Sequence, residues 1–252
     1  MKVFRIVASL CLVVALVSMA GLFYYRQIGH FYTASIYKPF CAWGLAMIAF
    51  TGALRAIRKA APCLLVLAGA FMTYGIGDVF MSWGEGYAIV GMGTFLVGHI
   101  AYICAIVLSD RIPSEKVFPY YASDKKRKQC AIIAGVFEAV SVSSLTIYLY
   151  ITSGDLVFAG TGFFYINAFS VIIACVCKYM HERKQVLLAL FGTIIYAVSD
   201  FAIAFRHLFG VQAFVRQFIM ATYYAGLFCF LGVFLPVIHR AIQASPQKPK
   251  LN

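Results

Sequence analysis

Residues 61–82 read APCLLVLAGAFMTYGIGDVFMS, an almost wholly apolar stretch that is long enough for one helix to cross a lipid bilayer. Its only charged residue is Asp78. A carboxylate at the centre of a membrane-spanning helix costs roughly 2.5 to 3.5 kcal/mol on insertion scales, and such residues commonly mark functional sites. The stretch therefore predicts a membrane-embedded helix that carries a functional acid.

A second aspartate occurs in the same local pattern. Residues 74–78, YGIGD, recur as residues 196–200, YAVSD, so that Tyr-x-x-(Gly/Ser)-Asp appears twice, each time inside an apolar stretch. A chain that accepts the energetic cost of a buried acid twice, in matched settings, is expected to use both acids. We predict that Asp78 and Asp200 form a pair and are the catalytic residues of the chain.

The composition places the chain among polytopic membrane proteins. It has 252 residues, of which 63% are hydrophobic and 12% are charged, whereas soluble domains are about 45 to 50% apolar and about 25% charged. The net charge of +12 could indicate nucleic-acid binding, but the basic residues flank apolar stretches, as residues that determine membrane topology do. We therefore expect no nucleic-acid partner.

Hydropathy predicts an all-α membrane bundle of eight transmembrane helices. The predicted spans are residues 4–25, 36–57, 61–82, 86–109, 129–152, 156–178, 186–206 and 212–238. They form one transmembrane domain, residues 1–240, which is followed by a polar cytosolic tail, residues 241–252.

The distribution of basic residues predicts that both termini are cytosolic. Of the 21 Lys and Arg residues, 17 fall on the side that holds both termini and the even-numbered loops. The other side holds Arg26, Lys38, Arg206 and Arg216. The positive-inside rule assigns the richer side to the cytosol. Residues 1–20 could instead be a cleaved signal peptide, but the apolar run continues through residues 23–25, so we favour a retained first helix.

The two aspartate motifs suggest an internal repeat. They lie 122 residues apart, about half of the chain, and the helices that carry them are predicted to run in the same direction, with both acids in the outer half. The segments that follow, residues 95–102 and 218–224, also resemble each other, which predicts a parallel repeat of four plus four helices. Coincidence is the alternative. A third acid inside a predicted span, Glu138, lacks the motif and is expected to join helices by hydrogen bonding or to take part in catalysis.

Other polar residues gather in the same predicted outer half. Lys38 precedes Pro39 at the expected start of the second helix, and it is either a lysine that reaches the membrane surface or a phosphate-binding group. His99 lies on the same helical face as Tyr102 and either packs against neighbouring helices or lines a site. Four further tyrosines are either packing or membrane-interface aromatics or members of the site, namely Tyr74, Tyr196, Tyr223 and Tyr224.

Motifs for several other chemistries are missing. The chain has no G-x-S-x-G, no H-E-x-x-H and no P-loop, and only one His lies clearly inside a predicted span, which argues against a catalytic zinc site of the three-His type. The plausible reactive groups are carboxylates, a His, a Lys and tyrosines. We expect no metal and no cofactor.

These residues resemble the YhhN-like lysoplasmalogenase family. The matching segments are Lys38-Pro39, Gly77-Asp78, Gly98-His99-Ile100-Ala101-Tyr102, Ser199-Asp200 and Ala221-Thr222-Tyr223-Tyr224. Each motif is short, but their order and spacing extend over nearly the whole chain; residues 135–180 carry no such motif. The candidate substrate-binding residues are Lys38, Tyr74, His99, Tyr102, Tyr196, Ser199, Tyr223 and Tyr224.

The resemblance implies hydrolysis of the vinyl ether bond of lysoplasmalogens to a fatty aldehyde and a glycerophospho-choline or glycerophospho-ethanolamine. It also implies a lysophospholipid substrate drawn from the surrounding membrane lipid and a location in the endoplasmic reticulum. Two carboxyl groups suit this chemistry, because one can donate a proton while the other stabilises the cation or activates water, as in glycoside hydrolysis. A proton-coupled transporter or a lipid-sensing receptor is the alternative, because both would also place acids inside membrane helices.

Overall fold

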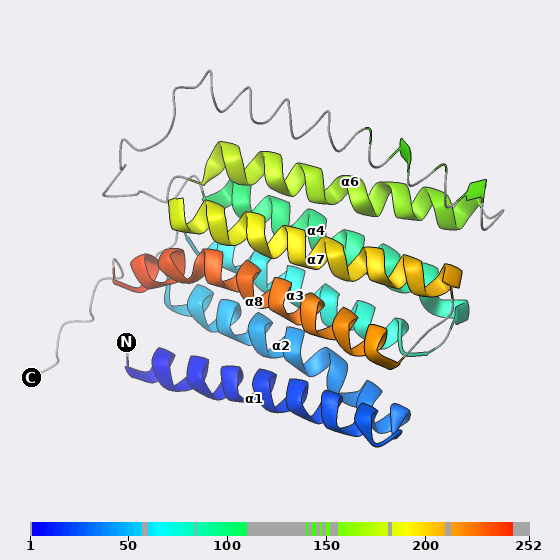
Figure 1. Ribbon diagram of the computed structural model, residues 1–252. Coiled ribbons are helices and arrows are strands. Elements are labelled where there is room, and N and C mark those ends of the chain that lie inside the picture. The colour runs from blue at the N-terminus through cyan, green and yellow to red at the C-terminus, as the bar shows by residue number, and fades with distance from the viewer. Residues whose placement is uncertain are drawn as a thin grey trace, which may run out of the picture.

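The computed structural model describes residues 2–56, 60–83, 85–109, 156–180, 183–209 and 213–243, together with single helical residues between 140 and 151 (Figure 1). Within these ranges the chain is all-helical. The helices are α1 (Lys2–Gln27), α2 (Phe31–Arg55), α3 (Ala61–Phe80), α4 (Ala88–Ser109), α6 (Leu156–Tyr179), α7 (Arg183–Phe209) and α8 (Ala213–Gln243), with a short 3-10 turn, η1 (Glu85–Tyr87), before α4.

The all-α prediction is confirmed, and seven predicted helices appear close to their expected bounds. Four of them are long and apolar enough to cross a membrane, in α1, α3, α4 and α8. The predicted fifth span, residues 129–152, and Glu138 lie outside the described residues, apart from the single helical residues already mentioned. The count of eight spans and the four-plus-four repeat therefore stay predictions.

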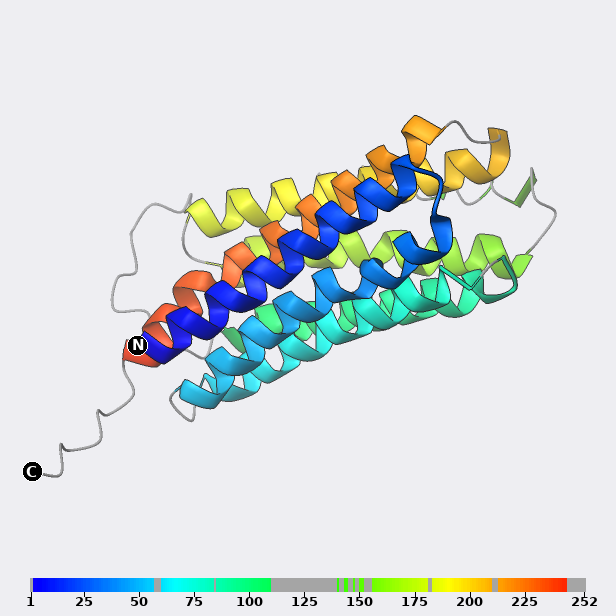
Figure 2. The same cartoon turned by 90° about the horizontal axis from the view of Figure 1, so that it is seen from below.

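The helices form one elongated bundle whose axes run roughly side by side (Figure 1). Helices adjacent in sequence pack together from α1 to α4 and from α6 to α8, and contacts of α2 with α8 and of α4 with α6 join the two halves. The N-terminus of α1 and the C-terminus of α8 lie at the same end (Figures 1 and 2). The two aspartate-bearing helices, α3 and α7, run in the same direction, as predicted (Figure 1).

Three helices pack against α2, namely α1, α3 and α8. Its buried face is made largely of small residues, which are listed here: Ala34, Cys41, Ala42, Gly44, Ala46, Ala49, Gly52 and Ala53. Small residues let helix backbones approach closely, and close packing is a main source of helix association in lipid, where the hydrophobic effect between helices is weak. The sequence of α2 therefore allows three neighbours to pack around one helix.

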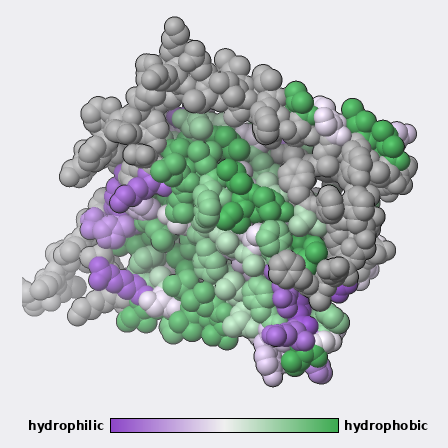
Figure 3. All heavy atoms as spheres, in the orientation of Figure 1, coloured by the Kyte–Doolittle hydropathy of each residue, from purple (hydrophilic) through white to green (hydrophobic). Residues whose placement is uncertain are grey.

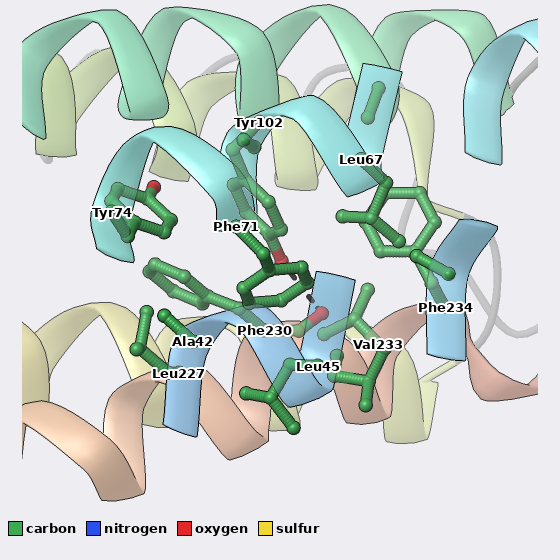
Figure 4. Packing of buried hydrophobic residues seen from close by; sticks show 14 of the residues in the cluster. Ala42, Leu45, Leu67, Phe71, Tyr74, Tyr102, Leu227, Phe230, Val233 and Phe234 are labelled. Atoms are coloured by element: carbon green, nitrogen blue, oxygen red, sulfur yellow. Dashed lines mark hydrogen bonds between the residues drawn. The ribbon is translucent and has the colours of Figure 1, made fainter. Parts of the chain in front are cut away.

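Larger aromatic side chains fill the interior between α3, α4 and α8 (Figure 4). Tyr102 stacks on Phe230 with ring centroids 4.4 Å apart, and its hydroxyl donates a hydrogen bond to the Phe230 carbonyl oxygen at 3.4 Å. The outward-facing side chains are apolar as well: Figure 3 shows a hydrophobic surface over the middle of the helices and hydrophilic residues gathered toward the ends of the bundle. An apolar belt of this kind is what a bilayer requires.

We predict that Gly98→Ala destabilises the protein. A Cβ at this position of α4 would lie 2.5 Å from Tyr74 Cε1 and 2.9 Å from Thr73 Oγ1 of α3. Overpacking a well-filled interface costs about 1–3 kcal/mol, so the thermal unfolding midpoint in detergent should fall.

The matched control for Gly98→Ala is Gly93→Ala on the same helix. Nothing lies within 4 Å of a Cβ built there, so this variant should be neutral or slightly more stable, because Ala has the higher helix propensity. Equal melting temperatures for the two variants would contradict the close α3–α4 packing.

Candidate active site

Asp78 lies in the last turn of α3 and is 3% exposed. The hydroxyl of Tyr223, from α8, donates a hydrogen bond to its Oδ2 at 3.0 Å. Lys38 of α2 and Arg26 of α1 lie close enough to interact electrostatically with the same carboxyl group. A buried acid is tolerated when other groups hydrogen-bond it and compensate its charge, and here three further helices supply those groups.

Asp200, on α7, lines the same pocket as Asp78. The pocket has a volume of about 60 Å³ and receives side chains from α1, α2, α3, α4, α7 and α8. Its lining residues are Arg26, Lys38, Asp78, Met81, Phe95, Tyr196, Ser199, Asp200, Arg216, Ile219, Met220 and Tyr223. The structure thus brings together the two acids that the sequence could place only on helices running in the same direction.

The tyrosines of the two matched motifs also meet. Tyr74 and Tyr196 are both fully buried, and their ring centroids are 5.9 Å apart. His99, which is likewise fully buried, lies beside both rings, and its Nδ1 is 2.8 Å from the Tyr74 hydroxyl. These three residues form a polar aromatic layer, of which Tyr196 reaches the pocket while Tyr74 and His99 lie behind it.

Helix α8 supplies two adjacent tyrosines with different partners. Tyr223 lines the pocket and bonds Asp78, whereas the Tyr224 hydroxyl donates to the backbone carbonyl of Lys38 at 3.2 Å. Ser199 also lines the pocket, and its Oγ donates to the Ile219 carbonyl of α8 at 3.0 Å. These bonds hold α8 against α2 and α7 at the level of the two acids.

The structure corrects the sequence-based interpretation of Lys38 and Pro39. Helix α2 begins at Phe31, so Pro39 lies inside the helix rather than in its first turn. Lys38 is only 7% exposed and lines the pocket, so it is not a lysine that extends to the membrane surface. The start was placed too late because residues 31–35, FYTAS, contain polar residues that lowered the local hydropathy.

Of the predicted site residues, the structure places six in the pocket and four behind it. The six are Asp78, Asp200, Lys38, Tyr196, Ser199 and Tyr223. The four others, Tyr74, His99, Tyr102 and Tyr224, belong to the packed interior next to the pocket. Substrate contact by these four stays a prediction.

Sequence reasoning missed two arginines of the pocket, Arg26 and Arg216, which it counted only as topology determinants. Arg26 lies in the last turn of α1, and Arg216 lies in the first turn of α8. A signal was present, because these two and Lys38 are three of the four basic residues on the side predicted to be poor in positive charge. No side chain of the fourth, Arg206, is described.

Within the ranges that the structure describes, no three His, Cys, Asp or Glu side chains are grouped so that they could hold a metal ion. The chemistry that the pocket offers is that of two carboxyl groups, two tyrosines and three basic side chains in a small space. Such a site can exchange protons and can bind an anion.

The fold and the pocket define an all-helical protein with apolar spans and an internal acid pair. Residues 33–233 match the model of the YhhN family, which covers more than half of the sequence. The chain belongs to the YhhN family, as the sequence motifs predicted. No curated protein and no solved structure matches it.

We predict that Tyr224→Phe lowers the stability of the protein modestly. The change removes the hydroxyl that donates to the Lys38 carbonyl but keeps the buried ring. Interhelical hydrogen bonds in membrane proteins contribute about 0.6 kcal/mol on average and up to about 1.7 kcal/mol. The free energy of unfolding, measured by titration with a denaturing detergent, should fall by this amount.

Tyr32→Phe serves as the control for this measurement, because Tyr32 is 85% exposed on the same helix that Tyr224 bonds. It should leave the free energy of unfolding unchanged. A shift of the same size in both variants would show that the bond between α8 and α2 adds no stability.

Proposed function

We propose that this protein hydrolyses the vinyl ether bond of lysoplasmalogens, releasing a fatty aldehyde and a glycerophospho-choline or glycerophospho-ethanolamine. The observation that carries the proposal is that two aspartates from separate helices line one pocket. Membership of the YhhN family supports it, because the motifs that resemble lysoplasmalogenases include both acids.

The first chemical step requires a neutral carboxylic acid. A vinyl ether is cleaved when a proton is added to the β-carbon of the double bond, which leaves an oxocarbenium ion at the carbon attached to oxygen. One aspartic acid donates this proton, and the second, as the carboxylate, stabilises the cation. Acids that share a small pocket titrate as a coupled pair, so one proton can be held between the two groups.

The second step requires water. The carboxylate removes a proton from a water molecule, whose oxygen attacks the oxocarbenium carbon and forms a hemiacetal. The hemiacetal then breaks its bond to the glycerol oxygen, which takes up a proton as the aldehyde leaves. A cavity needs about 10–15 Å³ per water, so the pocket of about 60 Å³ has room for a few water molecules.

The substrate is a membrane lipid, and the pocket lies where such a molecule can reach it. It is formed near the end of the bundle at which α1 and α3 end and α8 begins. In the proposed topology, with both termini cytosolic, this is the non-cytosolic end, and the lipid chain lies along the apolar helices. Residence in the endoplasmic reticulum belongs to the same proposal.

We expect Asp78→Asn and Asp200→Asn each to abolish aldehyde release while leaving a folded protein. The amide can neither donate nor accept the proton, and general acid–base catalysis contributes typically 10²- to 10⁴-fold in rate. The measurement is mass spectrometry of the aldehyde and the glycerophosphodiester formed by the purified protein from a lysoplasmalogen.

Glu85→Gln, in the turn before α4, is the matched acid-to-amide control and should keep full activity. A saturated ether analogue is the substrate control, because it cannot form the same cation. Full activity of either aspartate variant would remove that residue from the mechanism. Movement of intact lipid or proton flux without cleavage would favour a transporter instead.

Tyr223→Phe should lower kcat about 10- to 100-fold with little change in KM. The tyrosine hydroxyl fixes the Asp78 carboxyl through a bond of 3.0 Å, and a hydrogen bond to a charged group is typically worth about 1.5–3 kcal/mol. The ring, which packs against Phe95 and Tyr196, is retained.

Tyr24→Phe, at a tyrosine that is 60% exposed on α1, is the control and should behave as the wild type. A rise in KM with kcat unchanged in Tyr223→Phe would show that this hydroxyl binds substrate and does not orient the acid.

A further inference from the structure

Three basic side chains reach the pocket from three different helices. Arg26 comes from the end of α1, Lys38 from the second turn of α2, and Arg216 from the first turn of α8. They are far apart in the sequence and converge only in the folded bundle. A charged side chain in a pocket is stable only near opposite charge or hydrogen-bonding groups. Three basic side chains together therefore indicate a site for negatively charged groups.

The turn between α1 and α2 places Arg26. Gly29 has a φ of 81°, in the left-handed region that favours glycine, and the chain reverses there within three residues. The His30 amide donates to the Tyr25 carbonyl at 2.8 Å, and the Tyr25 ring stacks on Tyr37 at 5.5 Å. Because Arg26 follows Tyr25 and Lys38 follows Tyr37, this stack holds the two cations at the same level.

Arg216 is positioned by the first residue of α2. Its guanidinium carbon lies 5.6 Å from the centroid of the Phe31 ring, a distance at which a cation interacts with the face of an aromatic ring. Lys38 is positioned by burial and by the bond between its own carbonyl and Tyr224. Each of the three basic residues is thus held by a specific contact of α2 or of the turn before it.

Among the residues that the structure describes, the pocket lining carries more basic than acidic side chains. Three basic residues and two aspartates of this part of the chain line it, and their sum is +1 when both aspartates are ionised. Proton donation requires one aspartic acid to be neutral, and the sum is then +2. An anionic group of the ligand would offset this excess, and a phosphodiester carries one negative charge.

We propose that Arg26, Lys38 and Arg216 form a subsite for the phosphodiester of the lysophospholipid. The inference rests on the proposed function and extends it from the reacting bond to the recognition of the headgroup. In a lysoplasmalogen, only the three glycerol carbons separate the vinyl ether oxygen from the phosphate oxygen, so the acids and the cations of one site can act on the two groups together. Guanidinium groups bind phosphate through paired hydrogen bonds, and lysine binds it as a point charge.

This subsite recognises the phosphate rather than the amine of the headgroup. Lysophospholipids with choline and with ethanolamine should therefore bind with similar affinity, whereas an alkylglycerol without phosphate should bind weakly. The glycerophosphodiester product and inorganic phosphate carry the same chemistry without the chain, so they should compete only at much higher concentration.

The experiment measures binding to the full chain in maltoside micelles, with lipids that cannot be cleaved. The probes are a saturated ether lysophosphocholine and the corresponding alkylglycerol, with inorganic phosphate as competitor. We expect the lysophosphocholine to bind the wild type at least about tenfold more tightly than the alkylglycerol does. Arg26→Gln and Arg216→Gln should each remove most of this difference and leave alkylglycerol binding unchanged, whereas Arg216→Lys should retain part of it.

Arg5→Gln is the matched control for Arg26→Gln, because Arg5 is exposed near the other end of the same helix. Equal affinity of the wild type for the two lipids would overturn the subsite, and so would arginine variants that weaken both lipids equally. Should an arginine variant fail to fold, the wild-type comparison of the two lipids still decides.

A kinetic arm separates this proposal from the proposed function. With a lysoplasmalogen as substrate, Arg216→Gln should raise KM about tenfold or more with little change in kcat, and activity on an alkenylglycerol without phosphate should not fall. Phosphate-dependent binding without vinyl ether cleavage would uphold the subsite and reject the reaction. Cleavage that is equally fast for substrates with and without the phosphate would uphold the reaction and reject the subsite.

Discussion

The bond from the Tyr223 hydroxyl to the Asp78 carboxyl joins side chains that are 145 positions apart in the sequence, and the geometry of the pocket depends on it. An acid on a lipid-embedded helix is stable only where other helices supply hydrogen bonds and opposite charge, because the bilayer core offers neither. The requirement brings α8 to α3 and gathers the cations of α1 and α2 at the same level. The pocket therefore combines a hydrogen bond and nearby positive charge around one buried carboxyl group.

The residues around this bond keep the pocket small and its groups fixed. Tyr196 lies at the centre of an aromatic cluster, in contact with Tyr74, His99 and Tyr223 and stacked on Phe230. Close packing at Gly77 and Gly98, where an added Cβ would collide with Phe95 and Tyr74, leaves little room for these rings to move. These packed rings form an aromatic wall on one side of the pocket.

Much of the fold was predictable from the sequence, because apolar runs of about 20 residues and helix-flanking charges are local signals. The two aspartates were predictable for the same reason, since an acid within an apolar run stands out. That the two aspartates line one pocket could not be predicted, because a repeated motif indicates the depth and direction of the helices but not the distance between them. The start of α2 was misplaced because residues 31–35 contain polar side chains that lower the local hydropathy, although the chain is already helical there.

Arg26 and Arg216 show how a statistical rule can conceal residues that line a pocket. The positive-inside rule treats every basic residue as a topology determinant, so residues on the poorer side appear as noise. Yet three of the four such residues line the pocket in the structure. In the pocket these three cations lie beside two aspartates, an arrangement that a topology signal would not require. Exceptions to the charge bias are therefore a better guide to a site of this kind than the residues that obey it.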